Sequence, residues 1–129
     1  MLGNLALLKN ASELSHYAVA RHRVVGENIA NADTPGFRAR DLEPFSVEKP
    51  SEPAMRATRV GHIASASADA GRYSIVTADG GDVLSPNGNS VSLEEQMLLA
   101  GDARRQHSLA TSIYKKAMDI LRTSIAAPR

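Results

Sequence analysis

Apolar and small side chains recur at steps of four and three residues along the first quarter of the chain. This spacing is typical of a heptad-patterned helix rather than of a broad globular face. The segment contains no proline, and Gly26 is its only interior glycine. The pattern therefore predicts one long helix over about residues 5–32, with Ile29 lying just beside its stripe. The stripe consists of Leu7, Ala11, Leu14, Ala18, Arg21, Val25, Asn28 and Ala32.

The first helix is predicted to end near Asp33. Thr34 precedes a proline, which disfavours the helical conformation at Thr34, and Pro35 cannot donate a helical hydrogen bond. Pro35 and Gly36 together form a strong turn dipeptide. The sequence thus changes from a helix to a turn within four residues.

The stretch NIANADTPGF, residues 28–37, is interpreted as a helix-terminating turn. Asn28 and Asn31 are expected to bond backbone groups near the helix end, and Asp33 or Thr34 to cap the following turn. Phe37 is expected to fold back onto the helix. The motif positions are Asn28, Ile29, Ala30, Asn31, Thr34, Pro35, Gly36 and Phe37.

A second pattern with four- and three-residue steps predicts a helix over about residues 91–126. Ser92 is a suitable N-cap, and Glu95 follows it at the capping-box position. The main stripe is Leu93, Met97, Ala100, Arg104, His107, Thr111, Tyr114, Met118, Leu121 and Ile125. A neighbouring, mostly apolar stripe is Leu99, Ala103, Ala110, Ile113, Ala117 and Ile120. Two such faces on one helix indicate more than one partner helix.

Regular patterning fades over the middle segment, residues 33–90. Prolines and runs of small residues interrupt it, and only residues 72–78 (RYSIVTA) resemble a strand. We expect a weak hairpin or an extended loop there, in a segment that orders on assembly. The predicted fold is mainly α, with residues 1–129 as a single domain. Two long terminal helices pack as an α-helical hairpin or coiled coil around an irregular middle with room for a short β-hairpin.

Composition points to a thin core. Hydrophobic residues make up 43% of the 129 residues, but aromatic residues only 4%, and there is no tryptophan. Much of the apolar content is alanine, which buries little area per residue, so burial against other subunits is expected. The N-terminus lacks the pattern of a cleaved signal peptide, and no apolar run approaches the length of a membrane span. These features indicate a small soluble protein made in the cytoplasm.

The residues that carry chemistry do not form a recognisable active site. A net charge of +1 argues against a dedicated nucleic-acid binder, and the chain has no cysteine. His16 and His22 are six residues apart, which does not place them on one helix face, and no metal or phosphate motif occurs. Glu94 and Glu95 suit a helix N-terminus better than acid–base catalysis. We therefore expect no enzyme activity, no metal, no cofactor and no small-molecule substrate.

The sequence resembles a known family at several places. Residues 28–45 (NIANADTPGFRARDLEPF) are similar to the N-terminal signature of bacterial flagellar rod and hook proteins, in which a long helix ends in N-I-A-N followed by T-P-G-[FY]. Residues 57–64 (ATRVGHIA) and 86–97 (PNGNSVSLEEQM) resemble later segments of the short proximal-rod members. Ser92, Gln96, Ala103 and His107 depart from the common Asp, Glu, Asn and Tyr, so contacts of those residue types do not carry over.

The resemblance implies a structural subunit of the proximal rod of the flagellar basal body. Such subunits are exported by the flagellar type III apparatus without a cleaved signal peptide. They assemble helically in the periplasm into the shaft that passes torque to the hook. The implied partners are FlgC, FlgF, FliE and further copies of the chain. Alternatives are another short rod protein (FlgC-like), a cytoplasmic coiled-coil adaptor or export-associated module and, more remotely, a small hydrolase.

The stripe patterns and the implied assembly together lead to a packing hypothesis for the two helices. Leu7, Leu14, Val25 and Ile29 would pack on Met97, Tyr114, Met118 and Leu121, while the neighbouring alanine-rich stripe would meet adjacent subunits. The expected helix-packing residues are Leu7, Leu14, Val25, Ile29, Leu93, Met97, Tyr114, Met118, Leu121 and Ile125.

Overall fold

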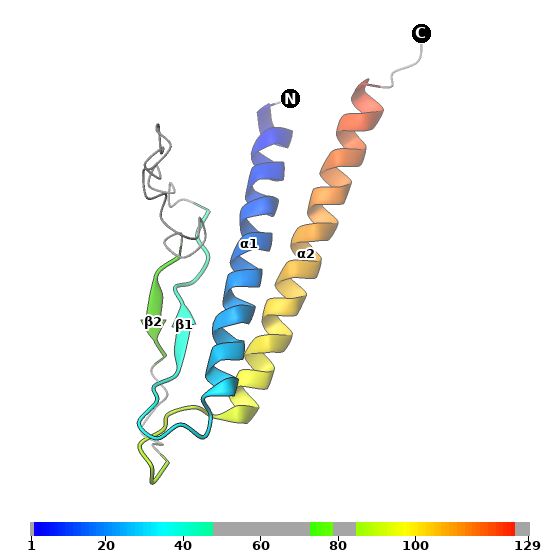
Figure 1. Cartoon of the computed structure of the whole chain (residues 1–129). Helices are drawn as coiled ribbons and strands as arrows, with labels where there is room; N and C mark the ends of the chain where they lie inside the picture. Colours follow the sequence, from blue (N-terminus) through cyan, green and yellow to red (C-terminus); the bar gives the residue numbers. More distant parts are fainter. Residues whose placement is uncertain (1, 48–72, 79–84, 126–129) are drawn as a thin grey trace, which may run out of the picture.

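The described residues, 2–47, 73–78 and 85–125 of a computed structural model, form two long helices and a two-stranded sheet. Figure 1 shows three layers, with the sheet on one side of the first helix and the second helix on its other side. The mainly helical fold with a small antiparallel sheet is the predicted one. In chain order the elements are α1 (Leu2–Ala30), β1 (Arg40–Leu42), β2 (Ile75–Thr77) and α2 (Leu93–Ile125).

Both helices match their predicted segments to within a few residues. Helix α1 begins at Leu2 and ends at Ala30, after which the Asn31 N–H bonds the carbonyls of Glu27 and Asn28 as the last turn tightens. At the start of α2, the Ser92 hydroxyl accepts a hydrogen bond from the Glu95 N–H at 3.4 Å, as an N-cap does. Neither helix, over the described residues, has an apolar stretch long enough to cross a membrane.

The two helices meet through small side chains at seven-residue intervals. On α1 the buried positions facing this way are Ala11, Ala18 and Val25, and on α2 they are Ala103, Ala110 and Ala117. We call these six residues the small-residue seam. Helix α2 is 33 residues long, about 50 Å at 1.5 Å per residue, yet it buries only the three alanines and Gln96. The seam therefore holds the pair together while leaving most of α2 uncovered.

The packing hypothesis for α2 is wrong at Met97 and Tyr114, because the alanines of the neighbouring stripe make the intramolecular contact instead. Met97 is 62% exposed and Tyr114 43% exposed, whereas Ala103, Ala110 and Ala117 of the other stripe are buried against α1. Small side chains allow the helix backbones to approach closely, and larger ones at the same positions would hold them apart. The hypothesis gave the intramolecular contact to the bulkier stripe, and the structure leaves Met97 and Tyr114 of that stripe facing outward.

A compact apolar cluster lies between α1 and the sheet. Tyr17 and Val24 of α1 pack with Leu42 of β1, and four half-buried residues complete the cluster. The Tyr17 ring lies 5.5 Å from the ring of Phe45 and 5.4 Å from that of Tyr73, in tilted and edge-on arrangements that favour aromatic pairs. The half-buried residues are Leu14, Ala20, Phe45 and Tyr73. Three of the five aromatic residues of the chain are thus used to fix the sheet on α1.

The sheet is short, and β2 confirms a strand at Ile75–Thr77, within the run that was predicted to be strand-like. Strand β2 pairs antiparallel with β1, with Arg40 opposite Thr77 and Leu42 opposite Ile75. Hydrogen bonds from Glu43 to Ser74 and from Ala78 to Ala39 extend the ladder by one step at each end. Strand β1 itself was not anticipated. The expectations for residues 48–72 and 79–84, including His62, lie outside the described residues.

A substitution that enlarges the seam should loosen the helix pair. Ala110 is fully buried, so Ala110→Leu is expected to lower the free energy of unfolding by about 1–3 kcal/mol through overpacking. Ala6→Leu, at an exposed position of α1, is the matched control and should change it little. Thermal unfolding followed by circular dichroism measures both. Equal midpoints for the two variants would show that the seam is not closely packed.

The buried tyrosine of the apolar cluster predicts a loss of stability in alkali. Burial raises the pKa of Tyr17, so the folded state holds the phenolic proton more tightly than the unfolded chain does. The contribution of the protonated Tyr17 to the free energy of unfolding is complete below about pH 10, the pKa of an unfolded tyrosine. This contribution is lost as the pH rises from there towards the pKa of Tyr17 in the folded state. Tyr17→Phe should flatten the fall of the melting midpoint above about pH 10. The exposed Tyr114→Phe should leave that fall unchanged.

Candidate functional site: a polar junction at the helix ends

The motif NIANADTPGF lies where the end of α1 meets the start of α2. The turn after α1 runs alongside the segment that leads into α2, at the end of the molecule opposite the start of α1 and the end of α2 (Figure 1). We call this region, residues 28–40 together with 85–96, the polar junction. Backbone hydrogen bonds join its two parts, from Gly36 N–H to the Asn87 carbonyl and from Ser90 N–H to the Phe37 carbonyl, both at 3.0 Å.

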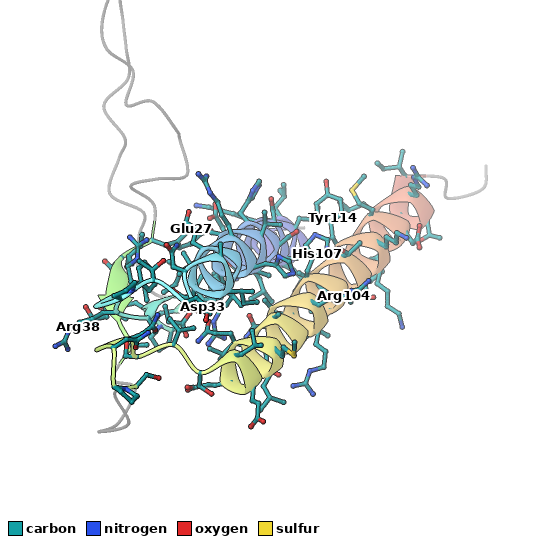
Figure 2. All side chains as sticks on the ribbon, turned by 60° about the horizontal axis from the view of Figure 1, so that its bottom comes forward. Glu27, Asp33, Arg38, Arg104, His107 and Tyr114 are labelled. Carbon is teal, nitrogen blue, oxygen red and sulfur yellow. The ribbon has the colours of Figure 1, made fainter. Side chains whose placement is uncertain are left out.

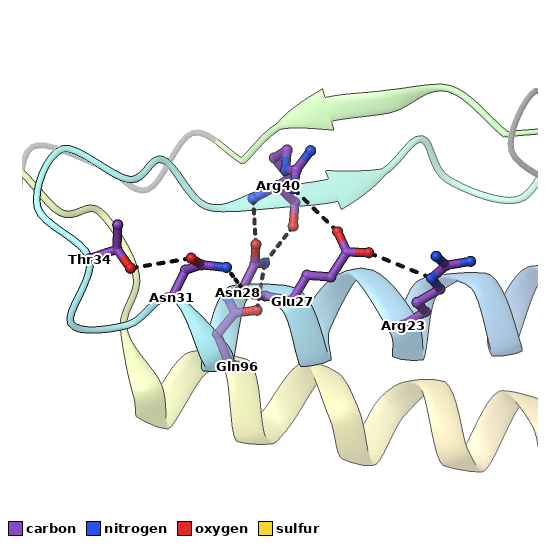
Figure 3. A network of polar contacts seen from close by, with 7 residues as sticks. All are labelled: Arg23, Glu27, Asn28, Asn31, Thr34, Arg40 and Gln96. Atoms are coloured by element: carbon purple, nitrogen blue, oxygen red, sulfur yellow. Dashed lines mark hydrogen bonds and ion pairs between the residues drawn. The ribbon is translucent and has the colours of Figure 1, made fainter.

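Asn28 lies at the centre of the junction with no exposed surface. Its Nδ2 donates to the Arg40 carbonyl at 2.6 Å and to Gln96 Oε1 at 2.9 Å, while its Oδ1 accepts from the Arg40 N–H at 3.0 Å (Figure 3). One amide thereby bonds both backbone groups of a residue in β1, as a neighbouring strand would, and also reaches α2. Asn28 was expected to bond backbone groups near the end of its own helix. The backbone groups that it bonds are those of Arg40 in β1.

Asn31 is the residue that caps the end of α1. Its Nδ2 donates to the Glu27 carbonyl at 2.8 Å, and the same carbonyl accepts from the Asn31 N–H, so one residue closes the last helical turn with both its side chain and its backbone. Its Oδ1 accepts from the Thr34 hydroxyl at 3.2 Å (Figure 3). The Phe37 N–H closes the following turn on the Thr34 carbonyl. The local interpretation as a helix-terminating turn therefore holds for these residues.

Asn89 binds the turn from the opposite side. Its side chain is almost fully buried, and its Nδ2 lies 2.7–2.9 Å from three turn carbonyls, those of Asn31, Ala32 and Thr34. The amide has two hydrogens, so one of them is shared between two carbonyls. Its Oδ1 accepts from the Val91 N–H at 2.7 Å, just before α2 begins. Asn89 thus ties the end of α1 to the approach to α2.

Two glycines allow the two turns of the junction to approach each other. Gly36 has φ +72° and Gly88 φ +77°, both in the left-handed region that favours glycine. A Cβ added at Gly88 would lie 3.7 Å from the Cα of Gly36. The turn therefore explains the glycine of the Pro35-Gly36 dipeptide, because the second residue of the dipeptide adopts a positive φ.

Ion pairs attach β1 to α1 beside the junction. Both oxygens of Asp41 accept from the Arg21 guanidinium, at 2.9 and 2.7 Å, and both side chains are largely buried. The hydrogen bond to Asp41 raises the pKa of Arg21 above its already high value, so Arg21 stays charged. Glu27 joins Arg40 at 3.2 Å and Arg23 at 3.5 Å (Figure 3). The Arg40 guanidinium also lies 5.8 Å from the centre of the Phe37 ring, so half-buried Phe37 packs near β1.

The predicted motif residues gather in this junction. Asn28 is buried and Asn31 and Phe37 are half-buried, whereas Ile29, Ala30, Thr34, Pro35 and Gly36 are exposed. The sequence reading singled out neither Gln96 nor Asn89 as a junction residue. The signal for Gln96 was a polar residue on an otherwise apolar helix face, and the signal for Asn89 was an asparagine next to a glycine. Both signals also occur in ordinary helices and loops, so neither points to a junction.

The expected helix-packing residues divide into buried and outward-facing groups. Val25 is buried in the seam, and Leu14, Met118 and Leu121 are half-buried. On α2, Figure 2 shows exposed Arg104, His107 and Tyr114 of the main stripe following one another along the helix. The exposed members of the expected set are Leu7, Ile29, Leu93, Met97, Tyr114 and Ile125.

The chemistry of the junction is that of a structural clamp. Its side chains donate to and accept from backbone groups, and no nucleophile is paired with a base there. In the part of the chain that the structure describes, no three histidine or carboxylate side chains gather as metal ligands could. His16, His22 and His107 are exposed. What the arrangement can do is fix the direction in which the chain leaves α1 and the position at which α2 begins.

Comparison with known proteins gives one informative relative. No family model matches this chain. It is 32% identical over 117 residues to the flagellar basal body rod protein FlgB of Agrobacterium fabrum strain C58, and the match covers 86% of each chain. The similarity therefore extends over both helices and is not confined to the turn motif.

Removing the Asn89 side chain should weaken the junction more than removing a neighbouring asparagine. Asn89→Ala removes the amide donor shared by three carbonyls and the acceptor of the Val91 N–H, and we expect a loss of about 1–3 kcal/mol in the free energy of unfolding. Asn87→Ala is the control, because its exposed side chain accepts one bond, from the Asn89 N–H. Urea titrations of both variants test this, and a larger loss for Asn87→Ala would contradict it.

Proposed function

We propose that this chain, which belongs to the FlgB family of flagellar basal body rod proteins, is a structural subunit that self-assembles helically with other rod proteins into the torque-transmitting shaft. The observation that carries the proposal is the 32% identity to FlgB of Agrobacterium fabrum over 86% of both chains. The role is structural rather than enzymatic, and residues 1–129 act as one unit in it.

The uncovered face of α2 supports assembly with other chains. Large apolar side chains point outward along its length, and a helix of this kind needs further helices to cover it. The exposed ones on α2 include Leu93, Met97, Leu98, Leu109, Tyr114, Ile120 and Ile125. We assign the exposed members of the expected helix-packing set to contacts between subunits. Contacts between unlike surfaces of successive subunits generate open helical filaments, which is the symmetry of a shaft.

The polar junction supports a shaft subunit in a second way. A subunit that transmits torque must hold its outer parts at a fixed angle to its helices. The buried amides and the Arg21–Asp41 ion pair attach β1 to α1 through directional bonds, which specify orientation more narrowly than apolar contact does. In the proposal, the motif sets where the segments outside the helix pair lie on the assembled tube.

The finer assignments follow from the family. We place the subunit in the proximal rod, in the periplasmic space, after export by the flagellar type III apparatus without a cleaved signal peptide. Its neighbours are further copies of itself, FlgC, FlgF and FliE. The small intramolecular core fits this route, because a chain with few buried residues and no cysteine is easily kept unfolded for export and gains stability on assembly.

Deleting the gene tests the proposal directly. The deletion strain is expected to be non-motile and to yield basal bodies without a rod, and the wild-type gene should restore both. Met97→Lys places a charge on the outward apolar face and should fail to restore motility. Ser108→Lys, at an exposed polar position of the same helix, should restore it. Complete rods in the deletion strain would rule the function out, whereas rescue by Met97→Lys would reject only the assigned face.

A further inference from the structure

The seam between the helices repeats itself at the same interval on both sides. Its residues recur every seven positions on α1 and every seven on α2, and all six are small or medium in size. The bond between Asn28 and Gln96 fixes the antiparallel alignment, in which each step back along α1 from Asn28 is matched by a step forward along α2 from Gln96. Ala18 therefore lies level with Gln106, between Ala103 and Ala110.

A slide of α2 by one seven-residue repeat, about 10 Å along its axis, would again place small residues between small residues. The apolar seam therefore discriminates poorly between these registers. Chain connectivity discriminates poorly as well, because α1 and α2 are joined by a long connection and closure entropy rises only slowly with length. A different feature must select the observed alignment.

The polar residues at the end of the seam distinguish the registers. Asn28 and Gln96 are both almost completely buried, and each continues the seam of its own helix past the last apolar residue. After a one-repeat slide, Asn28 would face Ala103 and lose its acceptor on α2, and Gln96 would lose its donor. A buried amide without its partner is unfavourable, so only the observed register satisfies both.

We propose that the Asn28–Gln96 pair is a register lock, which selects one of several alignments that the small-residue seam accepts about equally well. A single buried polar residue is known to select register in coiled coils in this way, at some cost in stability. Here the lock also reaches the sheet, because the same Asn28 amide bonds both backbone groups of Arg40. The position of α2 along α1 and the position of β1 thus both depend on one side chain.

Thiol cross-linking can read the register, because the natural chain has no cysteine. Three paired-cysteine versions of the full chain carry Ala18→Cys with one partner on α2. The partner is Gln106→Cys for the observed register, and Leu99→Cys or Ile113→Cys for a shift by one repeat in either direction. The parent chain should cross-link mainly between positions 18 and 106, and failure to do so would overturn the proposal.

Gln96→Met, which keeps the length of the side chain and removes its hydrogen bonding, tests the lock. The yield of the two shifted pairs relative to the 18–106 pair should rise about fivefold, the ratio that corresponds to one net hydrogen bond. Gln96→Glu keeps an oxygen acceptor for Asn28 and should keep the parent pattern. Circular dichroism checks that helix content is retained. If Gln96→Met loses helix content, Gln96→Ala takes its place, since alanine is the best helix former.

Gln106→Met is the matched control for the shifted pairs. It makes the same substitution on the same helix at a half-buried glutamine whose buried Oε1 has no hydrogen-bond partner among the described residues. Because position 106 is methionine in this control, the yield of each shifted pair is compared with the yield of the same pair in the parent chain. An equal rise for Gln106→Met and Gln96→Met would overturn the proposal. So would an unchanged pattern in Gln96→Met, or a rise caused by Asn89→Ala alone, which would assign register to the connection before α2.

Discussion

A single buried amide constrains most of this structure. Asn28 is completely removed from solvent, and its side chain bonds two backbone groups of β1 and one side chain of α2. A buried amide that loses its partners costs about 1–3 kcal/mol for each unsatisfied group. The end of α1, the position of β1 and the register of α2 must therefore be compatible with one another. The turn motif that follows Asn28 is the backbone path that makes them compatible.

The apolar contacts of the chain are few by comparison. One small cluster around Tyr17 holds the sheet on α1, and the small-residue seam holds α2 on the other side. Alanine contributes little hydrophobic free energy, so neither contact gives a large core. Larger apolar residues lie outward on α2, where they are available to neighbouring chains. The intramolecular fold is thus specified mainly by polar bonds, and the bulkier apolar surface is left for assembly.

The sequence predicted the elements better than it predicted their faces. Periodicity and the Pro35-Gly36 dipeptide located both helices and the turn, because these signals are local. The strand-like residues 72–78 were recognised, whereas β1 was missed because Arg40–Leu42 has no strand pattern and depends on bonds to Asn28 and Arg21. The buried roles of Gln96 and Asn89 were missed for the same reason. The partners that they bond at the end of α1 and in the turn after it lie more than 50 residues away in the sequence.

The reversed assignment of the α2 stripes has a physical explanation in the same bonds. Ranking stripes by side-chain size favours packing Met97 and Tyr114 onto α1, since they would bury more apolar area than alanine does. Turning α2 to bring that face inward would rotate Gln96 away from Asn28, because positions 96 and 97 point about 100° apart on a helix. The polar pair therefore opposes the very packing that hydrophobicity alone would choose. It keeps the alanines inside and the larger residues outside, which is the arrangement that a subunit needs if its main apolar contacts are with other subunits.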